Sequence, residues 1–220
     1  VLSALLVHLL QTKSVDYILQ IAAADDFPAR NTSVVSRSAD DVWKAAGSRY
    51  APSSPLEKLS DHLARPGRFA VVGKPCDIAA VRALSARDPR VDEKVPILIS
   101  FYCAGVPSTL GAAKIMQKLG VEEGDVREFR YRGDGWPGYA TAVTRSGEAR
   151  RMSYADSWGN ILSHHLQFRC KICPDGSGGF ADVEMIFDGT TLSLIGKNVN
   201  AYAQVEAAGS VDQLIDTLRD

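Results

Sequence analysis

Hydrophobic positions along the first half of the chain switch between helical spacing and short continuous runs. Residues 2–10 carry leucines at helical spacing and predict a buried helix, whereas residues 15–23 are typical of a strand. Downstream, the apolar runs 69–73 and 95–101 have the unbroken character of strands that are buried on both faces. A helical pattern follows each run, at residues 78–86 and 109–119. This succession predicts an α/β fold, with an open mixed sheet over residues 1–125.

Weaker local signals separate these runs. Val34 and Val35 predict a short strand that ends in a turn. Ser38 is placed to cap a helix through its hydroxyl, and acidic residues follow in the first turn. A loop rich in Pro and Ser at 51–55 leads into a helix predicted at 56–64.

From residue 126 the pattern changes to short alternating strands. We predict antiparallel strands at 126–132, 139–144 and 148–154. A rigid, glycine-rich loop joins the first two, and a helix is predicted at 161–167. Residues 126–183 are therefore expected to form an antiparallel and loop-rich region.

The last segment, residues 184–220, predicts a β-hairpin and a helix. Asp188-Gly189 is a preferred hairpin turn between strands expected at 185–187 and 191–195. Ser210 begins a helical pattern with an apolar stripe and a capping-box glutamine.

Composition and charge narrow the function classes. The 220 residues include 25 Lys and Arg and 26 Asp and Glu, so the net charge is −1. This balance gives no overall basic field, and we expect no nucleic-acid partner. The longest apolar run, residues 1–10, is too short to span a bilayer, so we expect no membrane span and a cytoplasmic location. The chain lacks an initiator Met, which suggests that it begins inside a longer protein.

Four cysteines are the main candidates for chemistry: Cys76, Cys103, Cys170 and Cys173. Each is expected in a loop with Gly or Pro nearby, and Cys76 and Cys103 each follow the end of a predicted strand. In an open α/β sheet, that edge is where ligands bind. Spacing alone leaves three interpretations open, namely an iron–sulfur cluster, a zinc site, or buried thiols beside a zinc half-site or disulfide.

Two further segments carry polar groups suited to an anionic ligand. Ser36-Arg37-Ser38 and the stretch 46–53 offer hydroxyls and arginines around a tight Gly turn, although on chemistry alone simple surface capping and turns are favoured. Arg130 and Arg132 lie near Trp136, which could clamp or stack on a planar anion or belong to an ordinary hairpin. His164 and His165 are interpreted as solvated helix residues. The sequence contains no hydrolase or P-loop motif.

Six short motifs occur in one order along the chain. They are Ser36-Arg37-Ser38, 47–53 (GSRYAPS), 72–79 (VGKPCDIA), 103–108 (CAGVPS), 130–138 (RYRGDGWPG) and 170–173 (CKIC). This series resembles the beta subunit family of coenzyme F-420 hydrogenase/dehydrogenase over residues 1–183. The resemblance implies an α/β flavin domain holding FAD beside at least one [4Fe–4S] cluster, with residues 126–183 closing over the cofactors.

Site residues follow from the resemblance position by position. The four cysteines match cluster ligands. Segments similar to those that contact the flavin contain Ser3, Ser36, Arg37, Ser48, Arg49, Tyr50 and Lys74. Arg132 and Trp136 are implied to lie near the flavin or the substrate. No catalytic residue is assigned.

The function implied is that of an oxidoreductase. Electrons would pass between the cluster, the flavin and a soluble hydride carrier such as coenzyme F-420 or a related substrate, with hydrogenase or dehydrogenase subunits as possible partners. The alternatives are a binding or scaffold domain that zinc stabilises through the four cysteines, without redox activity, and an inactive chimeric relative.

Several positions depart from the family pattern. The family has a Gly-Gly turn just before the segment that matches Val1, Arg49 stands where Lys is common, and residues 184–187 read EMIF. From Met185 onward the tail resembles a periplasmic, lipoprotein-carrier-like family of unknown function. A fusion, an unusual ending and a sequence junction each account for this.

Overall fold

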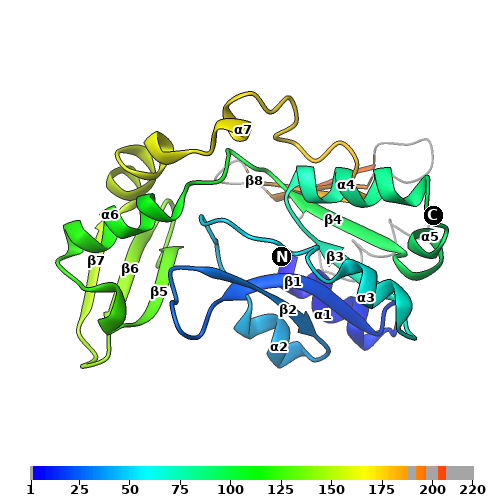
Figure 1. The fold of residues 1–220 in the computed structure, drawn as a ribbon, viewed down its shortest axis with the longest axis horizontal. Helices are drawn as coiled ribbons and strands as arrows, with labels where there is room; N and C mark the ends of the chain where they lie inside the picture. Colours follow the sequence, from blue (N-terminus) through cyan, green and yellow to red (C-terminus); the bar gives the residue numbers. More distant parts are fainter. Residues whose placement is uncertain (1, 188–191, 197–202, 207–220) are drawn as a thin grey trace.

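The computed structural model describes residues 2–187, 192–196 and 203–206 (Figure 1). Two sheets organise the chain. The larger has the strand order β10-β9-β8-β4-β3-β1-β2, and the smaller has the order β5-β6-β7. Strands of the larger sheet are β1 (Tyr17–Ala23), β2 (Asn31–Ser36), β3 (Phe69–Val72), β4 (Ile97–Phe101), β8 (Val183–Phe187), β9 (Leu192–Gly196) and β10 (Ala203–Glu206).

The larger sheet is mixed. β1, β3, β4 and β8 run parallel, whereas β2 is antiparallel to β1 and β9 is antiparallel to both β8 and β10. The expected α/β fold with an open mixed sheet is therefore confirmed. The predicted hairpin is also present, as β8 and β9. Its turn at Asp188-Gly189 and the helix expected from Ser210 lie outside the described residues.

Helices cover both faces of this sheet. α1 (Leu2–Gln11) and α2 (Ala39–Lys44) pack on one face, where Ile18, Ala70 and Ile99 are buried. The opposite face carries α3 (Leu59–Ala64), α4 (Pro75–Ser85) and α5 (Arg90–Lys94). Residues that alternate with the first set, such as Leu19 and Val71, are buried there. This alternation is the period-two pattern of a strand that is covered on both sides.

The smaller sheet forms a separate packing unit, on the left of Figure 1. Its strands are β5 (Val126–Gly133), β6 (Tyr139–Thr144) and β7 (Ala149–Ser153), close to the predicted bounds. α6 (Thr109–Leu119) packs against it, and the shared core includes Ile115, Phe129 and Tyr131. The remaining short elements are η1 (Glu123–Asp125), η2 (Ala155–Gly159), η3 (Leu162–His165) and α7 (Phe168–Lys171).

Several local predictions are confirmed and others are wrong. Ser38 accepts a hydrogen bond from the Asp41 amide, and the Asp41 carboxylate accepts one from the Ser38 amide, which completes a capping box at α2. The helix predicted at 161–167 is shortened to the 3-10 helix η3, and the π-helix η2 ends just before that range at Gly159. Leu166 has an extended backbone and bridges to Pro107, which ends the helical turn after His165.

Two cysteines expected in loops lie in helices instead. Cys76 is the second residue of α4, and Cys170 lies in α7. Pro75 begins α4 because its fixed φ suits the first helical position, and the Asp77 carboxylate accepts a hydrogen bond from the Lys74 amide at 3.0 Å. The sequence pattern missed α5 entirely. Within the described residues, no helix is long and apolar enough to cross a membrane.

Candidate functional site

The cysteines gather at the carboxyl ends of two neighbouring parallel strands. β3 and β4 pair in parallel with Val72 opposite Ile99, so their carboxyl ends lie at the same edge of the sheet. Cys76 follows β3 in the first turn of α4, and Cys103 comes two residues after β4. The predicted position of both cysteines at the ligand-binding edge is therefore what the structure shows.

The segment that carries Cys170 and Cys173 lies against the loop after β4. The Ser108 amide donates to the His165 carbonyl at 2.8 Å, and the Cys103 amide donates to the Gly176 carbonyl at 2.9 Å. Gly105 has a φ of +108° and faces this segment. A Cβ at Gly105 would lie 3.3 Å from the Cβ of Cys170, so glycine permits both the backbone conformation and the close approach.

Neighbouring thiols act on each other's pKa. Cys76 and Cys170 raise the pKa of Cys103, and Cys173 raises that of Cys76, each less than burial does. Burial is the largest cause that raises the pKa of the Cys76 and Cys103 thiols, and nearby Lys74 opposes it. The Val106 amide points at the Cys170 sulfur at 3.3 Å.

The thiols are close, but they do not converge on one ion. Within the described residues, no three His, Cys, Asp or Glu side chains are grouped tightly enough to hold a metal ion. Four thiolates on one zinc at about 2.3 Å would lie roughly 3.8 Å apart. In a cubane cluster each thiolate binds a different iron, so the sulfurs stand farther apart. The donor set of four thiols suits either a cluster or a zinc ion, and no preformed site for a single ion is present among the described residues.

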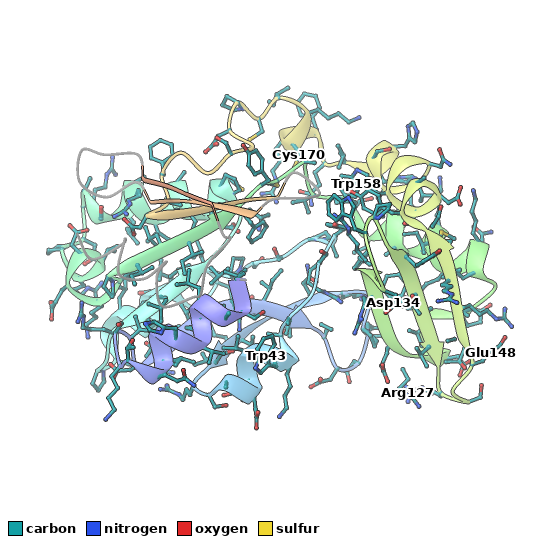
Figure 2. All side chains as sticks on the ribbon, turned by 180° about the vertical axis from the view of Figure 1, so that it is seen from behind. Trp43, Arg127, Asp134, Glu148, Trp158 and Cys170 are labelled. Carbon is teal, nitrogen blue, oxygen red and sulfur yellow. The ribbon has the colours of Figure 1, made fainter. Side chains whose placement is uncertain are left out.

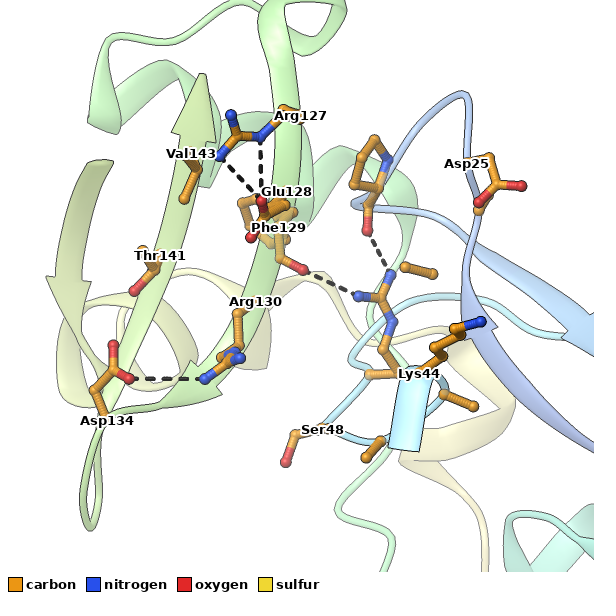
Figure 3. Close-up of a pocket in the computed structure, with 17 residues that line it drawn as sticks. Asp25, Lys44, Ser48, Arg127, Glu128, Phe129, Arg130, Asp134, Thr141 and Val143 are labelled. Atoms are coloured by element: carbon orange, nitrogen blue, oxygen red, sulfur yellow. Dashed lines mark hydrogen bonds and ion pairs between the residues drawn. The ribbon is translucent and has the colours of Figure 1, made fainter. Parts of the chain in front are cut away.

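A separate groove lies between the two sheets. It has a volume of about 500 Å³. Arg127, Glu128 and Arg130 come from β5 and Thr141 from β6, whereas Asp25, Lys44 and Ser48 come from the side of the larger sheet (Figure 3). Arg127 pairs with Glu128 at 3.1 Å, and Arg130 with Asp134 at 3.7 Å.

Two groups in the groove are without partners among the described residues. The Thr141 hydroxyl is buried and makes no hydrogen bond to any of them. Lys44 is exposed, and no described carboxylate lies within ion-pair distance of its ammonium. A buried hydroxyl without a partner is costly, so Thr141 is a group that a ligand could satisfy. The groove is therefore polar, open and of the size typical of cofactor sites.

Arg49 lines this groove, but its guanidinium is largely used by the protein. It donates to the carbonyls of Pro28, Arg30 and Phe129 at 2.6, 2.8 and 3.1 Å, and to Asn31 at 2.8 Å. These bonds join the β1–β2 connection to β5 across the groove. Burial lowers the pKa of Arg49. Arg49 therefore connects the two sides of the groove, the β1–β2 connection and β5.

Other residues expected to contact the flavin lie in different places. Ser36 pairs with Ile18 near the start of β1, and its hydroxyl accepts from Gln20 at 2.8 Å. Arg37 stacks on the ring of Tyr17, the first residue of β1, at 4.6 Å. Because β2 runs antiparallel to β1, both residues lie at the amino end of that strand, roughly 16 Å from the carboxyl end at Ala23.

Lys74 lies at the cysteine edge, directly before the helix that carries Cys76, whereas Ser3 is in the first turn of α1. Lys74 is 7% exposed, and its ammonium donates to Asp77 at 2.5 Å and to the Ser53 hydroxyl at 2.9 Å. Ser48 of the groove and Ser53 share one loop, so this loop connects the groove with the cysteine edge.

A cluster of rings surrounds Arg132. Its guanidinium carbon lies 3.8 Å from the ring centre of Trp136 and 4.6 Å from that of Tyr154. Its Nε donates to the Pro137 carbonyl at 2.8 Å, whereas one terminal nitrogen, Nη2, is buried without a partner in the described residues. Trp158 stacks parallel to Tyr154 at 6.4 Å.

This cluster extends to Tyr50. The ring of Tyr50 lies 4.8 Å from that of Trp158 and 5.7 Å from that of Tyr131. Tyr50, Arg132 and Trp136 therefore belong to one cluster, which joins two of the segments that the sequence analysis treated separately. Sequence analysis missed Tyr154, Trp158 and Thr141. The first two stand four residues apart in the segment YADSWG, a spacing that places rings on one side of a helical turn.

Comparisons with known proteins identify the family. Residues 1–60 match the model described as coenzyme F420 hydrogenase/dehydrogenase, beta subunit N-term, and residues 67–186 match the model of its C terminus. Residues 167–220 match a family described as a predicted periplasmic protein, which agrees with the resemblance noted for the tail. No curated protein matches this chain.

A solved structure shares the fold. It is described as a xenon derivatization of the F420-reducing [NiFe] hydrogenase complex from Methanosarcina barkeri. The TM-score is 0.67 at 20% identity, and the match covers 99% of this chain and 70% of that one. The two adjacent family matches span most of the chain. The chain therefore belongs to the coenzyme F420 hydrogenase/dehydrogenase beta subunit family.

Proposed function

We propose that this chain is a flavin- and iron–sulfur-dependent oxidoreductase subunit. It would pass electrons between a [4Fe–4S] cluster, FAD and a hydride carrier such as coenzyme F420. The observation that carries the proposal is that the segments bearing Cys76, Cys103 and the Cys170/Cys173 pair meet at one edge of the sheet. Family membership supports the redox role.

The cysteine edge supplies what a cluster requires of a protein. Four thiolates would ligate the irons. The Val106 amide, 3.3 Å from the sulfur of Cys170, would stabilise charge on that sulfur, as hydrogen bonds do at cluster sites. Lys74 adds a buried positive charge that favours the thiolate form of Cys76 and Cys103.

The groove between the sheets is the proposed FAD site. Flavin exchanges electrons in pairs as hydride or singly with a cluster, which is the chemistry it would supply here. The Thr141 hydroxyl is available to hydrogen-bond it, and Lys44 is available to face its pyrophosphate. Arg49 would hold the groove open at a fixed width through its carbonyl contacts.

The cluster of rings around Arg132 is the proposed site for the hydride carrier. The Trp136 ring is 57% exposed and already stacks on a cation. The buried Nη2 of Arg132 offers a donor to an anionic or carbonyl group. Tyr50 links this cluster to the loop that lines the groove, which would bring carrier and flavin to the same region.

We further propose that the chain works with hydrogenase or dehydrogenase subunits. The solved structure that shares its fold is a hydrogenase complex. That complex is described as F420-reducing, and a hydride carrier of that type is the substrate we infer for this chain.

Anaerobic purification of the full chain tests the proposal. We expect FAD to be released on denaturation, and iron and acid-labile sulfide to be present in equal amounts. We also expect reduced coenzyme F420 to bleach the flavin absorption. Stoichiometric zinc in a colourless protein would indicate the zinc-stabilised scaffold instead, and no binding of added FAD would indicate an inactive relative.

A further inference from the structure

The side chain of Asp175 organises the turn that follows the CKIC segment. Its Oδ1 accepts hydrogen bonds from the amides of Ser177 and Gly178 at 3.0 and 2.9 Å, and the Ser177 hydroxyl donates to the same oxygen at 3.2 Å. An aspartate that accepts from amides two and three residues ahead holds the backbone in a turn. We call residues 175–178 the Asp175 turn. It lies outside every helix and strand of the described chain, so this side chain is its main support.

The backbone of the Asp175 turn contacts two of the four cysteines. The Cys173 thiol donates to the Asp175 carbonyl at 3.3 Å, and the Cys103 amide donates to the Gly176 carbonyl at 2.9 Å. The approach is close, because a Cβ at Gly176 would lie 3.1 Å from the carbonyl oxygen of Cys103. Cys103 belongs to the loop after β4, whereas Cys173 follows α7. The Asp175 turn therefore joins the two segments that carry these cysteines.

The Asp175 turn fixes the exit of the CKIC segment, and other hydrogen bonds fix its entry. At the entry, the Gln167 amide donates to the Val106 carbonyl at 3.0 Å. Between entry and exit the chain crosses the outer edge of the molecule, where Figure 1 shows α7 and Figure 2 labels Cys170. Cys173 is exposed. Because an exposed side chain has few packing contacts, the position of Cys173 depends largely on the turn.

The three side-chain hydrogen bonds of this turn all end on one carboxylate oxygen. The other oxygen of Asp175, Oδ2, is buried and has no hydrogen-bond partner among the described residues. An asparagine with its amide oxygen at the place of Oδ1 would keep all three bonds, whereas an alanine would lose them. The two substitutions therefore differ in the bonds that form the turn.

We propose that Asp175 is a positioning residue for the cysteine site. Its Oδ1 holds the turn, and the turn sets the distance between the sulfurs of Cys103 and Cys173. The consequence for a [4Fe–4S] cluster rests on the proposed function, because both thiolates must then reach irons of the same cluster. The placement of the two sulfurs does not rest on it, since this placement is a property of the chain alone.

Cross-linking of the metal-free chain tests the placement of the two sulfurs. The parent for this test is the full chain with Cys76→Ser and Cys170→Ser, so that Cys103 and Cys173 are its two thiols. It is reduced, freed of metal with a chelator and treated with dibromobimane, which becomes fluorescent when it joins two thiols. We expect a fluorescent monomer. Asp175→Ala should slow this reaction about fivefold or more, because the turn loses three hydrogen bonds. Asp175→Asn should restore the parent rate.

A second variant acts on the same turn while Asp175 is intact. Ser177→Pro removes the amide that donates to Oδ1 of Asp175, so it should slow the reaction in the same way. Ser177→Ala keeps this amide and removes the hydroxyl alone, so it should have the smaller effect. This pair decides the question if Asp175→Ala does not fold.

The matched control is Asp182→Ala, which removes another bonded carboxylate from the same segment. Asp182 accepts from the Leu98 amide at 2.8 Å and pairs with Arg82, and Leu98 lies at the amino end of β4, away from the cysteine edge. We expect a lower urea midpoint and an unchanged cross-linking rate. An equal slowing in this control, no fluorescent monomer in the parent, or no recovery with Asp175→Asn would overturn the proposal.

Iron content of the protein with all four cysteines separates this proposal from the proposed function. A chain that binds iron, but whose cross-linking rate does not respond to Asp175→Ala, refutes the positioning role alone. A chain without iron, in which Asp175→Ala slows the reaction and Asp175→Asn restores it, supports the positioning role and refutes the cluster. If both proposals hold, a chelator should remove iron faster from the Asp175→Ala protein than from the Asp175→Asn protein.

Discussion

The ammonium group of Lys74 donates a hydrogen bond to the Ser53 hydroxyl at 2.9 Å and joins two parts of the candidate site. Ser53 belongs to the loop that also carries Ser48 of the groove, whereas Lys74 directly precedes the helix of Cys76. The same ammonium pairs with Asp77 at 2.5 Å. One buried cation thus connects the proposed flavin site with the proposed cluster site.

Replacing this cation should destabilise the fold. In Lys74→Met, the Asp77 carboxylate, whose side chain is 15% exposed, loses its ion-pair partner. We expect the free energy of unfolding to fall by about 3 kcal/mol, because a buried charge without its partner is costly. Ser53→Ala removes one hydrogen bond and should cost about 1 kcal/mol. Urea denaturation of both variants measures the difference, and equal losses would show that the ion pair is unimportant.

Gly105→Ala should disturb the position of Cys170. The new Cβ would lie 3.0 Å from a methyl group of Leu166 and 3.3 Å from the Cβ of Cys170, at a φ of +108°. We expect iron content to drop in addition to a loss of stability of about 1–3 kcal/mol. Gly47→Ala is the matched control, because its φ is +127° and its Cβ would meet nothing within 4 Å. Loss of iron in both variants alike would contradict the account of Gly105.

Thr141→Val separates binding from stability. The Thr141 hydroxyl is buried without a partner among the described residues, so its removal should leave the unfolding free energy unchanged or slightly higher. If the groove holds FAD, affinity for FAD should fall about tenfold, the value of one lost hydrogen bond of roughly 1.4 kcal/mol. Fluorescence titration with FAD measures this. Unchanged affinity would mean that the hydroxyl does not face the flavin.

His62 should make stability depend on pH. It is 7% exposed, its Nδ1 lies 3.3 Å from the Tyr17 hydroxyl, and burial is the largest cause that lowers its pKa below the ordinary value of 6.5. The unfolded chain therefore binds a proton more readily. The stabilising contribution of neutral His62 to the free energy of unfolding is fully present above pH 6.5. It is lost as the pH falls from there toward the folded pKa, by at most about 1.4 kcal/mol per pH unit.

His62→Phe should flatten this dependence between about pH 5 and 7. The charged neighbours Lys58, Asp61, Arg65 and Arg37 remain in the variant, so any slope that persists comes from other groups. Urea midpoints measured across the range give the slope. An identical slope in both proteins would assign the pH dependence elsewhere.

The sequence predicted helices and strands well where a regular apolar pattern and a terminating residue such as glycine mark their ends. α6 has the predicted bounds because its apolar stripe buries Ile115 and Met116, and Gly120 in the left-handed region ends it. β3 and β4 were predictable because both faces are buried. α5 was missed because its five residues contain a single buried apolar side chain, Val91, too little for a periodic pattern.

Placement in space was harder to predict than the elements. Ser36 and Arg37 looked like neighbours of Ser48 and Arg49, but the antiparallel direction of β2 carries them to the other end of β1. Likewise, β8 pairs in parallel with β4, which joins the tail to the main sheet. Strand order and direction depend on contacts between distant residues, and local periodicity does not encode them.

The gathering of the cysteines was predictable for Cys76 and Cys103, because parallel strands end at one edge. The approach of Cys170 depends on Gly105 and on backbone hydrogen bonds such as that from Ser108 to His165, which no sequence motif indicated. For Arg49 the motif was recognised, but the structural role was not. Its sequence motif suggested a contact to the flavin, whereas its bonds to three carbonyls could be recognised only in the folded chain.

Iron and acid-labile sulfide, counted per chain in the anaerobic protein and in four single Cys→Ser variants, test the central claim most directly. The account predicts about four irons and four sulfides in the parent protein. It also predicts a marked loss when Ser replaces Cys76, Cys103, Cys170 or Cys173 in turn. One zinc per chain without sulfide, or an iron content that Cys76→Ser and Cys103→Ser leave unchanged, would contradict it.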